Sequence, residues 1–471
     1  MIFSSAAFLF AFLPPVLALY YLPLFRNRPQ TEIFKKNLVL CIASLIFYAW
    51  GEPIYVILML LSIYFNFTIV RDMEHERRSP RRRKHLFIAA IIFNILVLGF
   101  FKYFGFLVET VNNVFSLHLP VVKLALPIGI SFYTFQILSY VIDVYNGKCH
   151  VQKSLLNFAT YVTMFPQLIA GPIVQYGDIE LQLRARRMNR RKFTAGILFF
   201  ARGLGKKVIF ANTIGAVYTE IAAMDPDNLG AVTAWFGILC YTLQIYFDFS
   251  GYSDMAIGLG KMFGFDFVQN FNFPYAATSI KDFWKRWHIS LSTWFRDYVY
   301  IPLGGNRKGT PRTILNILIV WTLTGLWHGA AWNFVAWGAY YGLLLLGEKY
   351  IYGKALEKLP VIVRRIITLF IVVIGWVFFS AESFPAAAQY LGAMFGGAGI
   401  FDGMTRYYLT ANLLPFTLMS CSALGMFRSF PISKNKDLRL VLQALGYAVV
   451  FAISVVCLVS DSFNPFLYFR F

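Results

Sequence analysis

The feature that most constrains this chain is a series of apolar runs that follows it from end to end. A helix that crosses a bilayer needs roughly 20 consecutive apolar residues, and many of the runs come close to that length. Of the 471 residues, 58% are hydrophobic and only 14% are charged, whereas a soluble domain carries about 25% charged residues. A single soluble core cannot bury this much apolar surface, so the sequence predicts a polytopic integral membrane protein. The runs fall at about 2–25, 37–50, 53–70, 86–104, 120–145, 154–175, 193–222, 229–262, 313–334, 335–350, 361–382, 408–427 and 440–461.

We expect an all-α fold in which residues 1–471 form a single membrane-embedded domain. Several runs are too short or too broken to cross a bilayer cleanly, so we expect about eleven transmembrane helices together with re-entrant segments. The first run lacks a basic segment before it and a small-residue cleavage site after it. It is therefore not a cleaved signal peptide by this pattern.

Two of the runs are interrupted by helix breakers. The stretch 165–172 contains Pro166, Gly171 and Pro172, which predicts a broken or re-entrant helix. The stretch 126–132 contains one proline and one glycine, and predicts a kink. Non-helical backbone at membrane depth is tolerated only where it is buried in protein or lines a cavity. Interrupted runs therefore indicate where a site can lie.

The positive charge of the chain is explained by topology. Lys and Arg number 43 and Asp and Glu 23, which gives a net charge of +20. In a soluble protein this excess would favour nucleic-acid binding. Here the cations gather in short loops between apolar runs, at 26–36, 71–85 and 184–192. This is the positive-inside pattern, so we expect these loops in the cytoplasm, the N-terminus outside, contact with membrane lipids and no nucleic-acid partner.

One polar interval, 279–312, differs from the other connections because it is both basic and rich in tryptophan. It is too polar to span lipid and too aromatic for a solvated loop. A helix that lies at the membrane interface, or one that dips into the protein, would suit this composition. On the first alternative Trp284, Trp287 and Trp294 would sit at headgroup depth, where tryptophans are enriched.

The histidines divide into two groups. Four of the six lie in loops or short connections, where we expect solvated side chains: His75, His85, His118 and His150. His288 lies in the aromatic-basic interval, and His328 lies between two apolar runs. An ionisable residue at membrane depth is costly to bury and is a candidate functional residue.

Two interpretations of His328 remain open at this point. It is either a structural histidine that hydrogen-bonds to a neighbouring helix or a residue that exchanges a proton, since histidine has an unperturbed pKa near 6.5. Gly325 and Gly329 flank it, so backbone can approach closely and leave room for a ligand. The second unusual histidine, His288, favours function.

Other reactive constellations are weak or missing. Asp248 and Asp254 stand six residues apart in an apolar run, and we expect each to accept hydrogen bonds from buried donors or to pair with an arginine. The five cysteines are scattered without a CxxC pair, and no ligands cluster, so no metal site is expected. Neither a P-loop nor a dinucleotide fingerprint is present.

Taken together, several motifs resemble those of the membrane-bound O-acyltransferase superfamily. Phe283-Trp284-Lys285-Arg286-Trp287-His288-Ile289-Ser290-Leu291-Ser292 and Trp327-His328-Gly329 resemble its two histidine motifs. Four further stretches are similar to the bacterial alginate O-acetyltransferase branch: 1–5, 165–172, 246–256 and 296–305. The resemblance covers nearly the whole chain.

The resemblance implies a ring-like helical bundle with a central tunnel in a bacterial cytoplasmic (inner) membrane. It implies His328 as the catalytic histidine and His288 as a second important histidine. Acetyl would pass from cytoplasmic acetyl-CoA, a substrate and not a bound cofactor, to a hydroxyl for O-acetylation of alginate, another exopolysaccharide or peptidoglycan. An extracytoplasmic acetyltransferase of the SGNH type would complete the transfer. The alternatives are D-alanyl transfer to teichoic acid from a carrier-protein thioester and, in another class, a transporter or flippase.

The remaining site predictions concern the donor, the oxyanion and a relay. We expect the donor site or the tunnel to be lined by Lys285, Arg286, Trp287, Trp327, Asn333, Asp248 and Asp254. Among these, Asn333, Trp327 or backbone N–H groups would stabilise the oxyanion. Near the aromatic C-terminus, Tyr468 is either an interfacial anchor or an acyl relay, because a phenol can form a covalent ester.

Overall fold

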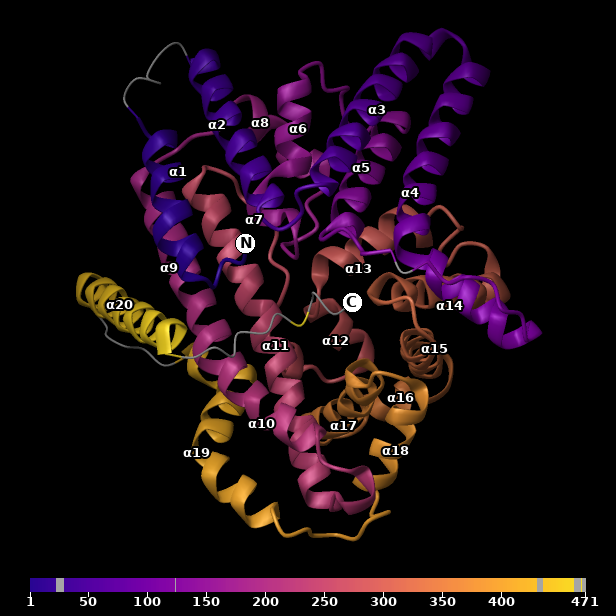
Figure 1. The fold of residues 1–471 in the computed structure, drawn as a ribbon, viewed down its shortest axis with the longest axis vertical. Helices are drawn as coiled ribbons and strands as arrows, with labels where there is room; N and C mark the ends of the chain where they lie inside the picture. The colour runs from indigo at the N-terminus through magenta and orange to yellow at the C-terminus, as the bar shows by residue number, and fades with distance from the viewer. Residues whose placement is uncertain (23–28, 123, 430–434, 461–466, 468–471) are drawn as a thin grey trace. The chain divides into compact units, whose positions relative to one another are not determined.

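The computed structural model describes residues 1–22, 29–122, 124–429, 435–460 and 467, and this part of the chain is helical with no strand (Figure 1). The all-α prediction is therefore correct for the described residues. The chain forms two compact units, one of residues 1–200 with 253–268 and the other of residues 201–252 with 269–471. The expectation of one catalytic domain over 1–471 stays a prediction.

The first unit consists of helices of very different length. Its elements are η1 (Ala7–Phe12), α1 (Leu13–Tyr20), α2 (Pro29–Ala49), α3 (Tyr55–His75), η3 (Glu76–Arg78), α4 (Pro80–Phe115), α5 (Ile130–Tyr145), α6 (Leu155–Thr163), α7 (Phe165–Leu168), α8 (Tyr176–Arg184) and most of α9 (Arg190–Gly205). Helices α3 and α4 form a long antiparallel hairpin (Figure 1). Asn66 and Asn94 link them through mutual amide hydrogen bonds of 3.2 and 2.7 Å. Such pairing satisfies polar groups that would be costly to leave exposed to lipid.

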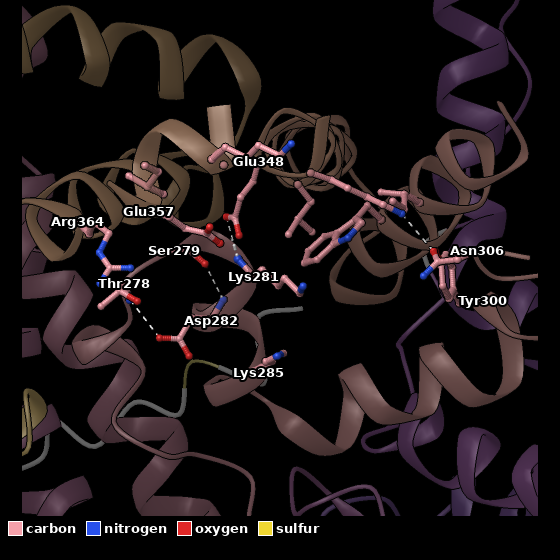
Figure 2. Close-up of a pocket in the computed structure, with 17 residues that line it drawn as sticks. Thr278, Ser279, Lys281, Asp282, Lys285, Tyr300, Asn306, Glu348, Glu357 and Arg364 are labelled. Atoms are coloured by element: carbon pink, nitrogen blue, oxygen red, sulfur yellow. Dashed lines mark hydrogen bonds between the residues drawn. The ribbon is translucent and has the colours of Figure 1, made fainter. Parts of the chain in front are cut away.

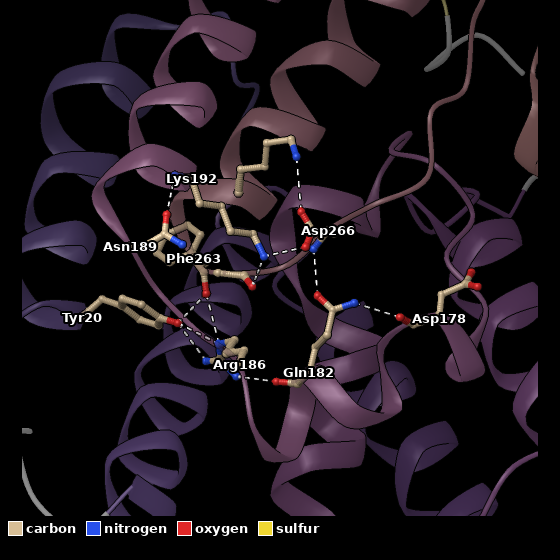
Figure 3. Close-up of polar contacts among 10 residues, drawn as sticks. Tyr20, Asp178, Gln182, Arg186, Asn189, Lys192, Phe263 and Asp266 are labelled. Carbon is tan, nitrogen blue, oxygen red and sulfur yellow. Dashed lines mark hydrogen bonds and ion pairs between the residues drawn. The ribbon is translucent and has the colours of Figure 1, made fainter.

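A buried arginine joins several segments of the first unit (Figure 3). The Nε of Arg186 donates to the Oη of Tyr20 and to the carbonyl of Phe263, both at 3.0 Å. Its Nη1 donates to Oδ1 of Asn37 at 2.6 Å. Arg186 is 6% exposed, so these bonds compensate for its burial. This arginine of the basic segment 184–192 is therefore a structural residue.

The two interrupted runs also lie in the first unit. The stretch 165–172 is broken, since α7 ends at Leu168 after a single turn, and its residues are buried. The kink expected in 126–132 is wrong. Helix α5 begins at Ile130, after Gly129 with φ of +76°. A Cβ at Gly129 would lie 2.7 Å from the carbonyl oxygen of Leu168, so glycine is required by both backbone conformation and close approach.

The second unit contains the remaining elements. These are η4 (Lys206–Ala211), α10 (Asn212–Ala222), η5 (Pro226–Asn228), α11 (Ala231–Met262, whose last turns belong to the first unit), η6 (Pro274–Ala276), α12 (Ile280–Arg286), α13 (Ile289–Phe295), η7 (Arg296–Tyr300), α14 (Gly309–His328), α15 (Trp332–Gly347), η8 (Glu348–Tyr352), α16 (Gly353–Glu357), α17 (Val361–Ser380), α18 (Phe384–Met394), α19 (Thr405–Ala423), η9 (Met426–Ser429) and α20 (Lys436–Ser460).

Four helical segments are long and apolar enough to cross a membrane: Tyr55–Arg78, Pro80–Phe115, Val361–Ser380 and Val441–Ser460. Helix α11 is also long, but almost all of its residues are buried in the protein. Within the described residues, length and hydropathy therefore mark four segments as candidate spans, whereas α11 forms part of the protein core.

Helices α14 and α15 pack through their backbones. A Cβ at Gly325 would lie 2.3 Å from the carbonyl oxygen of Phe334, and one at Gly338 would lie 2.3 Å from that of Trp321. Because no side chain separates them, the two helices approach as closely as glycine-containing membrane helices do. This hairpin carries His328.

The aromatic-basic interval folds as two short helices, α12 and α13. The hydroxyl of Ser279 accepts a hydrogen bond of 3.1 Å from the backbone N–H of Asp282 and so caps α12; such caps satisfy an otherwise unpaired N–H. The tryptophans do not face headgroups, because Trp284, Trp287 and Trp294 are only 8%, 3% and 5% exposed. The interfacial alternative is therefore wrong for them, and the interval dips into the protein.

Candidate active site

His328 is the last residue of α14, and its side chain is buried, with 5% exposed. Gly329 has extended backbone, so the helix ends there. The centre of the imidazole ring lies 5.1 Å from that of Trp337 on α15 and 5.2 Å from that of Phe379 on α17, both in edge-on geometry. His328 is thus enclosed by rings from neighbouring helices.

Four aromatic residues surround a small cavity beside His328. We call Trp287, Trp337, Trp376 and Phe379 the aromatic cage; Ile245, Asp248, Phe249 and Leu467 complete the wall. The ring centre of Trp376 lies 5.5 Å from that of Phe379 and 4.9 Å from that of Trp287. The cavity has a volume of about 10 Å³, which is room for about one water molecule.

A buried ion pair forms the polar edge of this cavity. The Nζ of Lys207 lies 2.8 Å from Oδ1 of Asp248, and both side chains are 3% exposed or less. The other carboxylate oxygen, Oδ2, accepts a 2.9 Å hydrogen bond from the backbone N–H of Leu467. Asp248 therefore has the structural pairing expected of it, with a lysine in place of an arginine, and it also lines the cavity.

His288 occupies a strained position between α12 and α13. Its φ is +44°, a left-handed conformation that non-glycine residues adopt at a cost of about 1–3 kcal/mol. Its Nδ1 lies 3.2 Å from Oδ1 of Asn270, which also accepts from Ser290 N and Oγ at 3.1 and 2.9 Å. An oxygen with these donors requires His288 Nδ1 to donate as well, which makes Nε2 the acceptor of the neutral ring.

Burial lowers the pKa of His288 to about 3, because desolvation disfavours the imidazolium form. The residue lies outside the four candidate spans. It is therefore neutral at physiological pH and can orient a group, but it is not a cation that holds an anion.

Two aromatic residues connect the histidines. The ring centre of Trp327 lies 5.8 Å from that of His288 and 4.9 Å from that of His328. Phe249 lies 4.7 Å from His288 and lines the His328 cavity. The sequence did not establish that the histidines are near one another; the structure brings both to the same two aromatic side chains.

On the His288 side lies an open groove, made of two adjoining pockets of about 480 and 590 Å³. The pockets share Lys281, Lys285, Tyr300, Ile317, Trp321 and Leu345. We call them together the basic groove; Figure 2 shows the second pocket. His288 lines the first pocket, so the groove reaches the strained histidine.

The basic groove carries an excess of cations. Lysines and arginines at its wall are Lys281, Lys285, Arg296, Lys349, Lys354 and Arg364, against the acids Asp282, Glu348 and Glu357. Within the described part of the chain, no ion pair joins a carboxylate to Lys281, Lys285 or Lys354, or to Lys349 or Arg364. Uncompensated cations in a concave surface attract anionic ligands.

Of the other residues predicted to line the donor site or the tunnel, some lie at the basic groove and others do not. Lys285 lines the basic groove, whereas Arg286 does not. The Nε of Arg286 donates to Oδ1 of Asp282 at 2.8 Å. Asn333 is engaged elsewhere: its Nδ2 donates to the carbonyls of Phe378 and Ala381 at 3.3 and 2.9 Å.

Two further predictions concern other parts of the chain. Asp254 belongs to the first unit and is not among the residues that line the His328 cavity. Tyr468 lies outside the described residues. The histidines His75, His85, His118 and His150 are exposed as expected. Only His118 and His150 lie in connections, because α3 extends to His75 and α4 already contains His85.

The expectation that Gly325 and Gly329 leave room for a ligand beside His328 is wrong. A Cβ at Gly329 would lie 2.2 Å from the ring of Phe334, and Gly325 faces the backbone of α15. The space that these glycines leave is therefore filled by protein and not by a ligand. They bring α15 close enough for Trp337 to contact His328.

Several residues of the site were not found by sequence reasoning. Lys207 was one member of a basic pair in an apolar run, a signal that could have marked a buried ion pair. Trp337, Trp376 and Phe379 stood in ordinary apolar runs. Nothing in their local sequence separates them from other buried aromatic residues.

Comparison with known proteins decides the family. The chain is 39% identical to the probable alginate O-acetylase AlgI of Pseudomonas putida over 499 positions that cover 100% of both chains. Residues 150–383 match the MBOAT, or membrane-bound O-acyltransferase, family. The chain belongs to this family. The protein is accordingly a membrane O-acyltransferase, and both histidine motifs lie in the matched region.

Two other relatives have names that give a different acceptor or a different transferred group. The chain is 35% identical to the peptidoglycan O-acetyltransferase of Helicobacter pylori, covering 85% of this chain and 81% of the relative. It is 26% identical to the teichoic acid D-alanyltransferase of Bacillus subtilis, covering 80% of this chain and 98% of the relative.

Proposed function

We propose that this chain transfers acetyl from cytoplasmic acetyl-CoA to a hydroxyl, for O-acetylation of extracytoplasmic polysaccharide such as alginate, another exopolysaccharide or peptidoglycan. The observation that carries the proposal is the pairing of a small aromatic cavity at His328 with a much larger basic groove at His288, with Trp327 in ring contact with both histidines. Two relatives of high coverage are named as O-acetylating enzymes, which supports acetyl as the group.

The basic groove is the proposed donor site. Acetyl-CoA carries phosphates, and the cations of the groove suit them. Helix α17, a candidate span, begins beside this groove, and Lys354, Lys358, Arg364 and Arg365 flank its start. By the positive-inside pattern this end of α17 faces the cytoplasm, where acetyl-CoA is found.

His328 is the proposed general base. It takes the proton of the acceptor hydroxyl while the oxygen attacks the thioester carbonyl carbon. The tetrahedral intermediate then collapses, the carbon–sulfur bond breaks, and the CoA thiolate leaves and recovers a proton from the imidazolium. Positioned proton transfer of this kind contributes about 10²–10⁴-fold. His288, held by Asn270, orients the incoming thioester.

The oxyanion needs a donor, and Trp337 supplies it in this proposal. Its side chain is 1% exposed and lines the cavity beside His328. Its indole Nε1 has no hydrogen-bond partner within the described residues, and a buried N–H without a partner costs about 1–3 kcal/mol. A developing oxyanion would satisfy it. Asn333 is unsuited, since its amide N–H groups are already used.

We propose that a partner protein receives the acetyl group from this chain and passes it to the polysaccharide. A polysaccharide chain cannot enter a cavity of about 10 Å³, so an SGNH-type extracytoplasmic acetyltransferase receives the acetyl group. Tyr468 is the proposed relay. Support comes from its neighbour Leu467, whose side chain lines the His328 cavity and whose N–H binds Asp248. Tyr468→Phe removes only the hydroxyl, and acetylation that survives it unchanged would exclude the relay.

We further propose a multi-pass arrangement in the bacterial inner membrane, with about eleven embedded helices, a central tunnel and an external N-terminus. Cysteine-accessibility labelling of intact cells tests this topology. Labels on the 71–85 loop from outside the cell would contradict it.

The test of function uses purified full-length protein in proteoliposomes with radiolabelled acetyl-CoA and, separately, a D-alanyl carrier-protein thioester. Acetyl-CoA consumption that requires His328 supports the proposal. Consumption of the D-alanyl thioester alone would replace it with teichoic acid D-alanylation. Movement of an intact solute without thioester cleavage would favour the transporter alternative, which membership in an acyltransferase family argues against.

A further inference from the structure

The aromatic cage leaves almost no space beside His328. The cavity is about 10 Å³, close to the size of one water molecule and hence of one methyl group. The cage residues are all buried, with Trp337 and Trp376 1% exposed and Trp287 and Phe379 3% exposed. Whatever carbon chain reaches His328 must fit among these rings.

The cage is held from behind by further packing. The ring centre of Phe379 lies 5.3 Å from that of Phe334, and the ring centre of Trp337 lies 5.2 Å from that of Tyr341. The ring centre of Trp376 lies 6.3 Å from that of Phe283. Rings packed on both sides cannot move apart without disturbing a second layer, because protein interiors are close-packed.

The backbone behind the cage is equally fixed. Helix α15, which carries Trp337, touches α14 through Gly325 and Gly338. On the opposite wall, Ile245 and Phe249 both belong to the buried helix α11 and are 5% and 3% exposed. The walls formed by α15 and α11 are therefore costly to displace.

The basic groove is much larger than the cavity at His328, since its two pockets have volumes of about 480 and 590 Å³. On the proposed function the bulky donor lies in this groove, and its acyl end reaches the much smaller cavity at His328. We propose that the aromatic cage, together with Ile245, restricts the transferred acyl group to two carbons. The inference rests on the proposed acyl transfer at His328, and it assigns chain-length selection to named residues.

The expected discrimination follows from pocket chemistry. One additional methylene in a fitted hydrophobic pocket changes specificity by roughly 10- to 200-fold. Acetyl-CoA should therefore be used at least tenfold more efficiently than propionyl-CoA, and butyryl-CoA less still.

The experiment measures free thiol released from acetyl-, propionyl- and butyryl-CoA by the full-length protein in proteoliposomes. Hydroxylamine serves as a small acceptor that needs no partner protein, and the rate with His328→Ala is subtracted. The readout is the ratio of kcat/KM for propionyl to acetyl. A ratio does not depend on the amount of folded protein.

Two variants enlarge the cavity, and each has a matched control. Ile245→Val removes one methyl group from the wall, and Phe379→Leu removes part of a cage ring. Ile238→Val and Phe236→Leu make the same changes at buried positions of α11 that do not line the cavity. Both cavity variants should raise the propionyl-to-acetyl ratio about tenfold, and both controls should keep the wild-type ratio.

The outcomes separate this inference from the proposed function. A wild-type protein that uses propionyl-CoA as well as acetyl-CoA overturns the cage alone, as does an unchanged ratio in active Ile245→Val and Phe379→Leu. Thiol release that persists in His328→Ala overturns the chemistry at His328 and the cage with it. A wild-type protein that consumes no CoA thioester overturns the donor and the inference together.

Discussion

The surroundings of His328 and those of His288 are opposite in character, although Trp327 contacts both rings. His328 lies in a small, aromatic cavity of about 10 Å³ with one buried ion pair at its edge. His288 lies at an open groove with unpaired cations. On the proposed function this difference separates two tasks: donor binding energy would arise in the groove, and the chemical step would take place where water is largely excluded.

If this division is right, changes on the His328 side will affect catalysis or stability strongly, and changes on the open side will affect mainly donor affinity. The largest effect is expected from His328→Ala, which removes the proposed base. Acetyl transfer should fall by about 10²–10⁴-fold, measured with radiolabelled acetyl-CoA. His85→Ala, at an exposed histidine of α4, is the control, and equal losses in both variants would contradict the assignment.

The next largest effect concerns the buried ion pair. Asp248→Asn leaves the Lys207 charge uncompensated and should destabilise the protein by about 3–5 kcal/mol, seen as a lowered Tm in detergent. The double variant Asp248→Asn with Lys207→Met removes both charges and should recover most of that loss. A double variant as unstable as the single one would show that the pair does not act as a unit.

A smaller loss is expected at the proposed oxyanion donor. Trp337→Phe removes the indole N–H and should lower kcat by about 10²–10³-fold with little change in KM. Trp235→Phe is the matched control, because that indole donates to the carbonyl of Met394, away from the cavity. A KM effect without a kcat effect would leave Trp337 as a wall residue only.

The smallest effect belongs to the open side. Lys354 lines the basic groove, while Lys358, one turn later, is exposed and does not. Lys354→Gln should raise the KM for acetyl-CoA about two- to fivefold, and the difference should shrink at high salt because exposed charges are screened. An identical response of Lys358→Gln would mean that the groove does not bind the donor.

The sequence indicated much of this arrangement, but not its most selective part. Apolar run lengths located the helices, and the rarity of histidine at membrane depth pointed to His328. Of the cage, only Trp287 was among the residues predicted to line the site. Trp337, Trp376 and Phe379 escaped prediction because they come from α15 and α17, and only tertiary packing brings them beside Trp287. For the same reason the sequence left the place of the 279–312 tryptophans open, since their composition fits both lipid headgroups and a protein interior.

The backbone contact between α14 and α15 has a further consequence for motion. The two helices touch through Gly325 and Gly338. Because no side chain lies between them that could rotate to absorb a displacement, the two helices move together as one rigid unit. His328 lies on α14 and Trp337 lies on α15, yet the distance between the two side chains stays fixed. Any opening that admits an acceptor must therefore come from the other walls, and the proposed base and its oxyanion donor travel together through the catalytic cycle.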